Sequence, residues 1–209
     1  MTGSIIETDA DVAEGAAWLA ARDPRFAMAL GRTGPLPLRR RPDGFAQLFS
    51  AIISQQVSVA SARAIQARVE ALGATDPAAL LACSDADLRA CGLSRQKIAY
   101  GRAIATSGVD LDALRTRSDA DVVAELVRIR GVGIWTAEIY AMFSLGRADV
   151  FAPGDLALRE AARTLFELDS RPTEGALRAM SLAWSPWRSV AARLLWAWYR
   201  VDRDREGVT

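Results

Sequence analysis

The stretch that decides the fold is residues 128–140, which read RIRGVGIWTAEIY. Its two flanks have the apolar spacing of α-helices, yet Gly131 and Gly133 interrupt the pattern. A glycine inside a helix costs roughly 0.5–1 kcal/mol relative to alanine, so two of them indicate a break. The stretch therefore predicts two helices joined by a tight turn, with Trp135 in the first turn of the second helix.

The predicted turn has the properties of an anion site. Gly133 precedes the second helix, and the N–H groups at a helix N-terminus are unsatisfied and lie at the positive end of the helix dipole. We expect both glycines to adopt positive φ and to let another surface approach closely. A DNA phosphate fits such a turn, because phosphate contacts position a protein on DNA without reading its sequence. The predicted phosphate-binding residues are Arg130, Gly131, Val132 and Gly133, with an ordinary helical corner as the competing interpretation.

Apolar or small residues occupy the positions at which the two helices must pack. These are Leu126, Ile129, Val132, Thr136 and Ala137. The resulting pattern L-x-x-I-x-G-V-G-x-x-T-A resembles the helix-hairpin-helix of DNA repair glycosylases. By itself this motif implies only non-specific binding to DNA.

The rest of the chain also shows a 3.6-residue apolar period, and strand alternation is hard to find. We therefore predict an all-α protein of roughly ten short helices. The expected helices cover residues 9–21, 24–30, 44–56, 58–73, a short one from 77, 84–92, 94–107, 118–129, 134–145, 155–167, 173–184 and 186–201.

Composition narrows the class of protein. The 209 residues are 51% hydrophobic and 24% charged, which is typical of a globular protein. No apolar run is long enough to cross a membrane, and the acidic N-terminal stretch does not have the pattern of a signal peptide. The net charge of +1 favours no nucleic-acid partner by itself.

The absence of histidine excludes several kinds of active site. It rules out Ser-His-Asp and Cys-His catalysis and removes the commonest general base, so acid–base chemistry must come from carboxylates. Two cysteines are too few for an iron–sulfur cluster.

A second motif lies at residues 149–159, DVFAPGDLALR, where Asp155 opens a predicted helix. The plain explanation is an N-cap, worth about 1 kcal/mol. A hairpin followed by a loop and Pro-x-Asp at a helix start is, however, the arrangement of the helix-hairpin-helix glycosylase superfamily. The resemblance implies that Asp155 is the catalytic carboxylate.

Three further segments are similar to the DNA-3-methyladenine glycosylase II branch of that superfamily. They are IISQQVSV (52–59), GLSRQKIAY (92–100) and SPWRS (185–189), the last followed by Trp196. The resemblance runs from about Asp23 to Tyr199, with the motifs in the family's order. It implies one glycosylase unit over residues 1–209, with two helical lobes, a catalytic cleft between them and no N-terminal α/β domain.

The resemblance also implies the reaction. A monofunctional DNA glycosylase removes alkylated purines such as 3-methyladenine and 7-methylguanine in base excision repair, by hydrolysis of the N-glycosidic bond. Its partner is double-stranded DNA with alkylated bases, with no membrane, and we expect a monomer in the cytoplasm, associated with the nucleoid. Trp135 stands where lyase members carry a Schiff-base lysine, and Trp135 and Trp196 match positions of the base pocket. Most of the tryptophans between 184 and 198 are expected in the core.

Two further roles follow from the resemblance. Gln56, with Gln55 beside it, matches the wedge that fills the gap left by the flipped base. The family's hairpin also binds a monovalent or divalent cation through backbone carbonyls, here those of Val127, Ile129 and Val132. No cofactor is required for the reaction.

Three other functions remain open. A non-catalytic helix-hairpin-helix DNA-binding protein needs neither Asp155 nor an aromatic pocket. A glycosylase for another damaged base, oxidised or mismatched, is disfavoured by the missing lysine and cluster cysteines. A helical protein-interaction module has only the near-neutral charge in its support.

Overall fold

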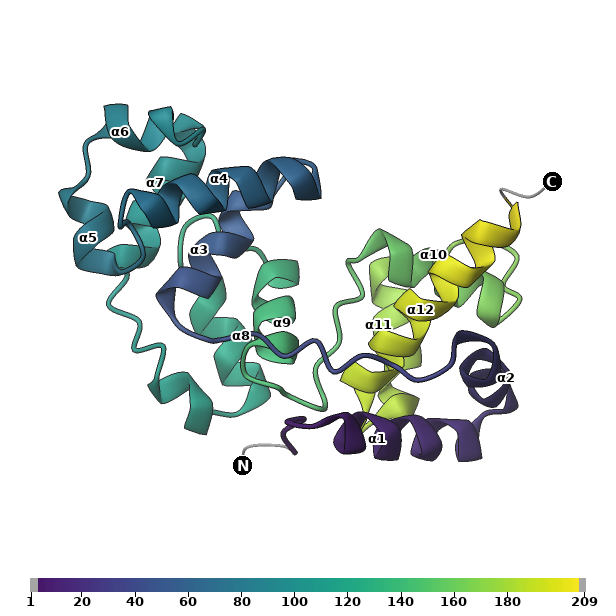
Figure 1. The fold of residues 1–209 in the computed structure, drawn as a ribbon. Coiled ribbons are helices and arrows are strands. Elements are labelled where there is room, and N and C mark those ends of the chain that lie inside the picture. Colours follow the sequence, from purple (N-terminus) through teal and green to yellow (C-terminus); the bar gives the residue numbers. More distant parts are fainter. Residues whose placement is uncertain (1–3, 207–209) are drawn as a thin grey trace. The chain divides into compact units, whose positions relative to one another are not determined.

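The computed structural model describes residues 4–206, and the regular secondary structure in this range is helical, as predicted (Figure 1). In this range the backbone bridge between Ile5 and Arg147 is isolated and belongs to no strand. The helices are α1 (Asp9–Arg22), α2 (Pro24–Thr33), α3 (Phe45–Ile53), α4 (Val59–Ala71), α5 (Pro77–Ala82), α6 (Asp85–Ala90), α7 (Arg95–Ala105), η1 (Ala113–Thr116), α8 (Asp119–Val127), α9 (Ile134–Phe143), α10 (Leu156–Leu165), α11 (Glu174–Ser181), η2 (Leu182–Trp184) and α12 (Arg188–Glu206).

The chain divides into two compact units. Unit 1 is the continuous segment Arg41–Tyr140, which holds α3 to α8 and most of α9. The described part of unit 2 consists of residues 4–40 and 141–206, which carry α1, α2 and α10 to α12 (Figure 1). Unit 2 is therefore built from the two ends of the chain, while unit 1 is built from its middle.

Helix α7 organises unit 1. It packs against α3, α5 and α6. Its contact with α3 is close at Gly101, where an added Cβ would lie 2.5 Å from the ring of Phe49. Leu48, Ile52 and Ile53 of α3 are fully buried. Because α3 packs closely against α7, the position at which the following chain leaves Ile53 is fixed.

Helix α12 organises unit 2. It packs against α10, α2 and α1. Arg193 of α12 is buried and donates hydrogen bonds to the carbonyl oxygens of Leu38 (3.0 Å) and Ser189 (2.9 Å). Burial, and then the positive charges of Arg39 and Arg40, lower the pKa of Arg193 to about 10. These bonds tie the first part of the unit to its last helix.

The helix starts follow the predicted caps. Asp23 caps α2 with Pro24 in its first turn, and Ser118 caps α8 through the amide of Asp121 (3.2 Å). Polar side chains with extended backbone satisfy the first free N–H groups of a helix, which is why these starts can be read from sequence.

Several predicted helix ends are wrong. The helix expected to reach Gln56 ends at Ile53, because the chain turns at residues 54–57 and Gln56 adopts a left-handed conformation with φ 57°. The last helix continues to Glu206, beyond the expected residue 201. The short helix η1 was not expected at all.

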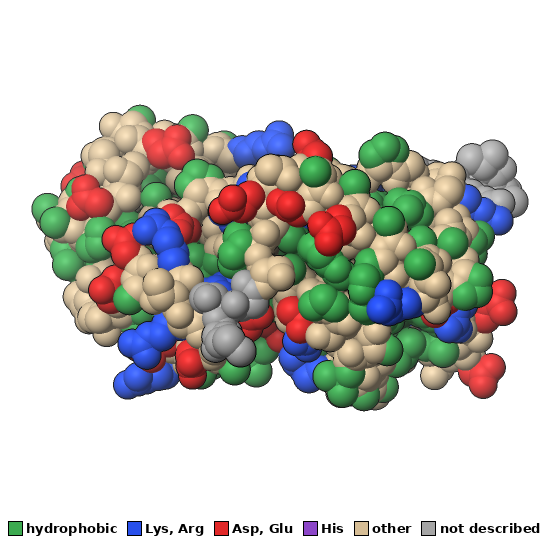
Figure 2. Space-filling view, turned by 90° about the horizontal axis from the view of Figure 1, so that it is seen from below, with side chains coloured by type: hydrophobic (Ala, Val, Ile, Leu, Met, Phe, Trp, Pro, Cys, Tyr) green, Lys and Arg blue, Asp and Glu red, His purple; other side chains and the backbone are tan. Residues whose placement is uncertain are grey.

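The surface carries charges of both signs. On the face drawn in Figure 2, the Lys and Arg side chains are interspersed with Asp and Glu. This mixture agrees with the net charge of +1. Within residues 4–206, no helix has the length and apolar character needed to cross a membrane.

Candidate DNA-binding hairpin and carboxylate site

The hairpin predicted from the glycines is present in unit 1. Helix α8 ends at Val127, the amide of Val132 donates to the carbonyl oxygen of Ile129 (3.0 Å), and α9 starts at Ile134. The predicted packing residues are all buried: Leu126, Ile129, Val132, Thr136 and Ala137. The turn is thus fixed from within, while Arg130 and Gly133 are exposed.

The two glycines serve different purposes. Gly131 has φ 97°, and a Cβ there would lie 2.3 Å from Cγ of Tyr100, so both the backbone conformation and the close contact require glycine. Gly133 lacks the positive φ that we expected, and nothing lies within 4 Å of its Cβ position. The reason is that the sharp change of direction is completed at Gly131. The space beside Gly133 keeps the N-terminus of α9 accessible.

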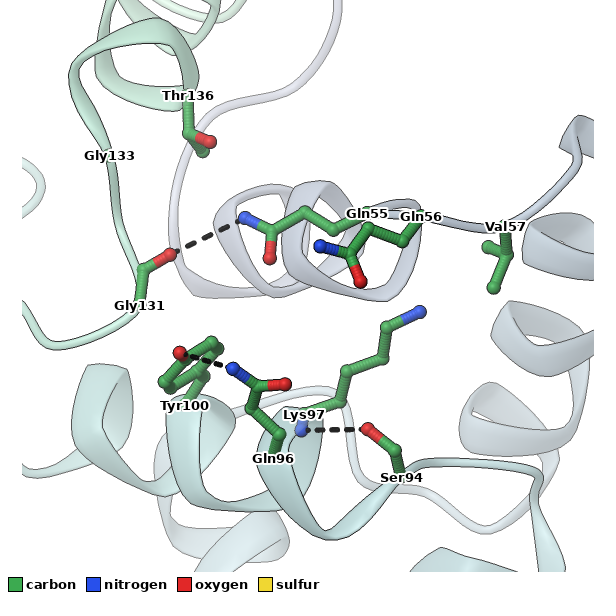
Figure 3. Close-up of a pocket in the computed structure, with 10 residues that line it drawn as sticks. All are labelled: Gln55, Gln56, Val57, Ser94, Gln96, Lys97, Tyr100, Gly131, Gly133 and Thr136. Carbon is green, nitrogen blue, oxygen red and sulfur yellow. Dashed lines mark hydrogen bonds between the residues drawn. The ribbon is translucent and has the colours of Figure 1, made fainter.

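The turn at residues 54–57 lies next to the hairpin, and we call it the wedge turn. Gln55 donates from Nε2 to the carbonyl oxygen of Gly131 at 3.4 Å, and the neighbouring Gln56 is exposed. Gln55 therefore joins the wedge turn directly to the predicted hairpin within unit 1. Figure 3 shows both glutamine side chains above a cavity of about 440 Å³.

Helix α7 forms the opposite wall of this cavity (Figure 3). Lys97 donates from Nζ to the carbonyl oxygen of Ile53 at 2.6 Å, and burial lowers the pKa of this lysine. Gln96 donates to the hydroxyl oxygen of Tyr100 at 2.7 Å. We did not predict these two contacts. The bond of Lys97 joins residues more than forty positions apart. The bond of Gln96 depends on which face of α7 these residues occupy, and periodicity alone does not define that face.

Asp155 caps helix α10 in unit 2, as its position predicts. Its Oδ1 atom accepts hydrogen bonds from the amides of Ala157 (2.9 Å) and Leu158 (3.2 Å). The residue is half-buried, at the end of a loop whose preceding residues Ala152 and Pro153 are buried. The carboxylate is therefore held rigidly at the positive end of a helix.

Trp196 of α12 lies against this carboxylate. Its indole Nε1 donates to Oδ1 of Asp155 at 3.2 Å, and its ring packs against Phe143 with centroids 5.7 Å apart. Trp184 and Trp198 are buried in the core, as expected for most tryptophans of this region. Of the tryptophans between 184 and 198, Trp196 is the one that the structure joins to the predicted catalytic residue by a hydrogen bond.

Trp135 belongs to unit 1, in the first turn of α9. It is 42% exposed, and Ile134 beside it is 49% exposed. These two partly exposed apolar side chains therefore lie next to the hairpin at the start of α9. The indole face also attracts cations, by about 0.5–2 kcal/mol, and the attraction is stronger where water is excluded from the contact.

These groups define what the protein can do chemically. Among residues 4–206, no group of three or more Cys, Asp and Glu residues is placed to hold a metal ion. A fixed carboxylate with an indole N–H on it can stabilise a neighbouring positive charge. An exposed helix N-terminus with small residues can accept a phosphate.

Comparisons with known proteins agree with these features. A family model described as HhH-GPD superfamily base excision DNA repair protein matches residues 49–188. A DNA-3-methyladenine glycosidase from Bacillus halodurans has a similar structure, with a TM-score of 0.82 and 32% identity over 98% of this chain and 95% of that one. The Schizosaccharomyces pombe 3-methyladenine DNA glycosylase Mag1, solved with abasic DNA, gives a TM-score of 0.76 and 27% identity, over 88% and 95% of the two chains.

Coverage differs among the curated relatives. The Bacillus subtilis protein YfjP is 37% identical over 114 residues, which is 53% of this chain and 40% of that protein. The chain therefore spans less than half of YfjP, but nearly the full length of the two solved structures.

Proposed function

The chain belongs to the HhH-GPD superfamily of base excision DNA repair proteins, and we propose that it is a monofunctional DNA glycosylase for alkylated purines. Its substrates are 3-methyladenine and 7-methylguanine in double-stranded DNA, and it hydrolyses their N-glycosidic bond. The observation that carries this proposal is the carboxylate of Asp155, oriented by the N-terminus of α10 and by Trp196.

The chemistry needs no histidine. A purine methylated at N3 or N7 is a cation, so it leaves without being protonated first. As the bond breaks, the sugar develops oxocarbenium character, and a carboxylate in a preorganised position stabilises that charge. Asp155 takes this role, and the same carboxylate orients the water that attacks the sugar.

Two tryptophans supply the surface for the base. Trp196 is joined to the carboxylate, and Trp135 is exposed beside the hairpin. We propose that each of these indole faces can contact a flipped, cationic base. Attraction between a cation and an aromatic face favours an alkylated purine over a neutral one.

The hairpin and the wedge turn contact the DNA itself. The hairpin, residues 130–133, binds a phosphate at the N-terminus of α9, and Gln56, supported by Gln55, fills the gap that the flipped base leaves. All of these groups come from one chain, which supports a monomer as the active form. A DNA partner places the protein with the chromosomal DNA of its cell.

A cation at the hairpin remains part of the proposal. The carbonyl oxygens of Val127, Ile129 and Val132 are neutral hard donors, which suit a monovalent or a weakly held divalent ion. The carbonyl of Ile129 already accepts the amide of Val132, and its second lone pair leaves room for an ion. Such an ion would add positive charge next to the phosphate.

The decisive experiment measures free base released from duplex DNA treated with a methylating agent. We expect 3-methyladenine and 7-methylguanine in the supernatant, with undamaged purines released only very slowly. A non-catalytic DNA-binding protein would bind the same duplex, with a steep dependence on salt, and would release nothing. Release of an oxidised base instead would point to the other class of glycosylase.

A further inference from the structure

Lys97 is the single lysine of the chain, and the glycosylase reaction as proposed does not use it. We infer that Lys97 is a positioning residue that holds the wedge turn in the conformation needed to enter duplex DNA. This inference rests on the proposed function, since it gives the wedge turn its task.

The contact is placed where a positive charge has most effect. Helix α3 ends at Ile53, and the carbonyl groups at a helix C-terminus are unsatisfied and carry the negative end of the dipole. Lys97 reaches from α7 to the carbonyl oxygen of Ile53, at 2.6 Å. Figure 3 shows its side chain rising from α7 toward the two glutamines. The bond is thus charge-assisted and half-buried, which makes it stronger than an ordinary surface hydrogen bond.

The wedge turn needs such support because its backbone is strained. Gln56 has φ 57°, a conformation that costs a residue with a side chain about 1–2 kcal/mol. Strained residues persist only where their surroundings hold them in place. Two side-chain bonds join this region to other elements of unit 1: Lys97 binds Ile53, directly before the turn, and Gln55 of the turn binds Gly131 over a longer distance, 3.4 Å. By distance and charge, the lysine is the stronger of these two attachments.

When the wedge turn enters a duplex, the stacked bases resist its insertion. Unstacking a base costs a few kcal/mol, and the side chain that fills the gap must keep its place between stacked neighbours. A single-stranded substrate has little stacking to overcome. Loss of the lysine contact therefore weakens the enzyme on duplex DNA and leaves its action on single strands nearly intact.

The test compares Lys97→Met with the wild type and with a matched control. Methionine keeps the length of the stem and removes the ammonium group. The control is Arg102→Met, because Arg102 lies on the same helix and donates to the backbone carbonyl of Cys83 (2.9 Å), away from the wedge turn. Single-turnover release of 7-methylguanine is measured from a duplex and from the same strand alone, and thermal melting shows whether each variant is folded.

A second readout does not depend on catalysis. A fluorescent base, 2-aminopurine, is placed next to an abasic-site analogue in a duplex, so that its emission rises when the neighbouring stack is opened. We expect Lys97→Met to bind this duplex with a smaller rise than the wild type or Arg102→Met gives. Where Lys97→Met does not fold, Lys97→Gln, which keeps a neutral donor of shorter reach, carries the same comparison.

The expected result is a fall of about tenfold in the ratio of duplex to single-strand excision for Lys97→Met, the size expected from loss of one charge-assisted hydrogen bond. Arg102→Met should keep the wild-type ratio. An unchanged ratio in a folded Lys97 variant, or an equal loss on both substrates, overturns the inference. A wild type that releases no alkylated base from either substrate overturns the proposed function instead.

Discussion

The indole nitrogen of Trp196 and the carboxylate of Asp155 form a hydrogen bond of 3.2 Å, although 41 residues separate them in the chain. The oxygen that accepts this bond also accepts two backbone amides of α10. Donors from two different helices therefore fix the rotation of one carboxylate.

Asp155→Asn should abolish most base excision and leave the fold intact. Asparagine caps a helix about as well as aspartate, and its oxygen can still accept the bonds to the amides and to Trp196. The charge is lost, so we expect the barrier to rise by on the order of 3 kcal/mol, a fall of about a hundredfold or more in rate. Single-turnover release of base and binding to duplex DNA measure the two effects.

A matched control for this variant is Asp76→Asn. Asp76 caps α5 in the same way, through the amide of Ala79 at 2.9 Å, and has no proposed role in catalysis. Its excision rate should stay at the wild-type level. An Asp155→Asn enzyme as fast as this control would remove Asp155 from the mechanism.

Trp135→Ala should reduce excision of cationic bases more than that of a neutral base such as hypoxanthine, if the neutral base is cut at all. The physical reason is the attraction of about 0.5–2 kcal/mol between an indole face and a cation. Single-turnover rates for both kinds of base give the comparison. Trp18→Ala is the control, since that half-buried tryptophan is engaged by Arg22 over its ring, at 3.6 Å from the centroid. Equal losses for the two bases would mean that Trp135 only packs.

The product of the reaction should be an abasic site in an unbroken strand. Cleavage of the backbone by a lyase step needs an amine that forms a Schiff base with the sugar. The position that carries this lysine in lyase members is Trp135, and Lys97 is bound to the carbonyl of Ile53. Reaction mixtures treated with borohydride should contain no covalent adduct of protein and DNA, and appreciable trapping would contradict the monofunctional assignment.

Substitution of each hairpin glycine by alanine should have different effects on stability and on DNA binding. Gly131→Ala places a Cβ against Tyr100 in a left-handed conformation, so it should cost about 1–2 kcal/mol of stability from the backbone alone, with the clash added. Gly133→Ala meets no protein atom, so stability should be kept while DNA affinity falls, because the added methyl stands at the exposed helix start. Thermal melting and DNA titration separate the two effects. A destabilised Gly133→Ala, or unimpaired DNA binding by that variant, would count against the hairpin as a phosphate site.

Local signals explain why much of the fold was predictable from sequence. Capping residues such as Asp23, Ser118 and Asp155 satisfy amides two or three positions ahead, so their effect is contained in a few neighbouring letters. The glycine turn is likewise local. These signals predicted helix starts and the hairpin, and the structure bears them out.

The parts that escaped prediction depend on residues far apart in the chain. Helix α3 was predicted to reach Gln56, but it ends at Ile53, whose carbonyl oxygen accepts a hydrogen bond from Lys97 on another helix. Both hairpin glycines were expected to adopt positive φ, but only Gly131 does, and its contact with Tyr100 comes from another helix. The bond between Trp196 and Asp155 also joins residues 41 positions apart in the sequence, which periodicity cannot predict.

The division of the chain has a consequence for the order of folding during synthesis. Unit 1 is a continuous segment, so it can pack as soon as Tyr140 has left the ribosome, as domains generally fold in the order of their synthesis. Helices α1 and α2 are made before unit 1, but they pack against α12, which is made after it. Their packing against α12 must therefore wait until unit 1 has been made. The surroundings of the carboxylate are therefore completed only after unit 1 has been made, and a chain that lacks α12 also lacks the indole that donates to Asp155.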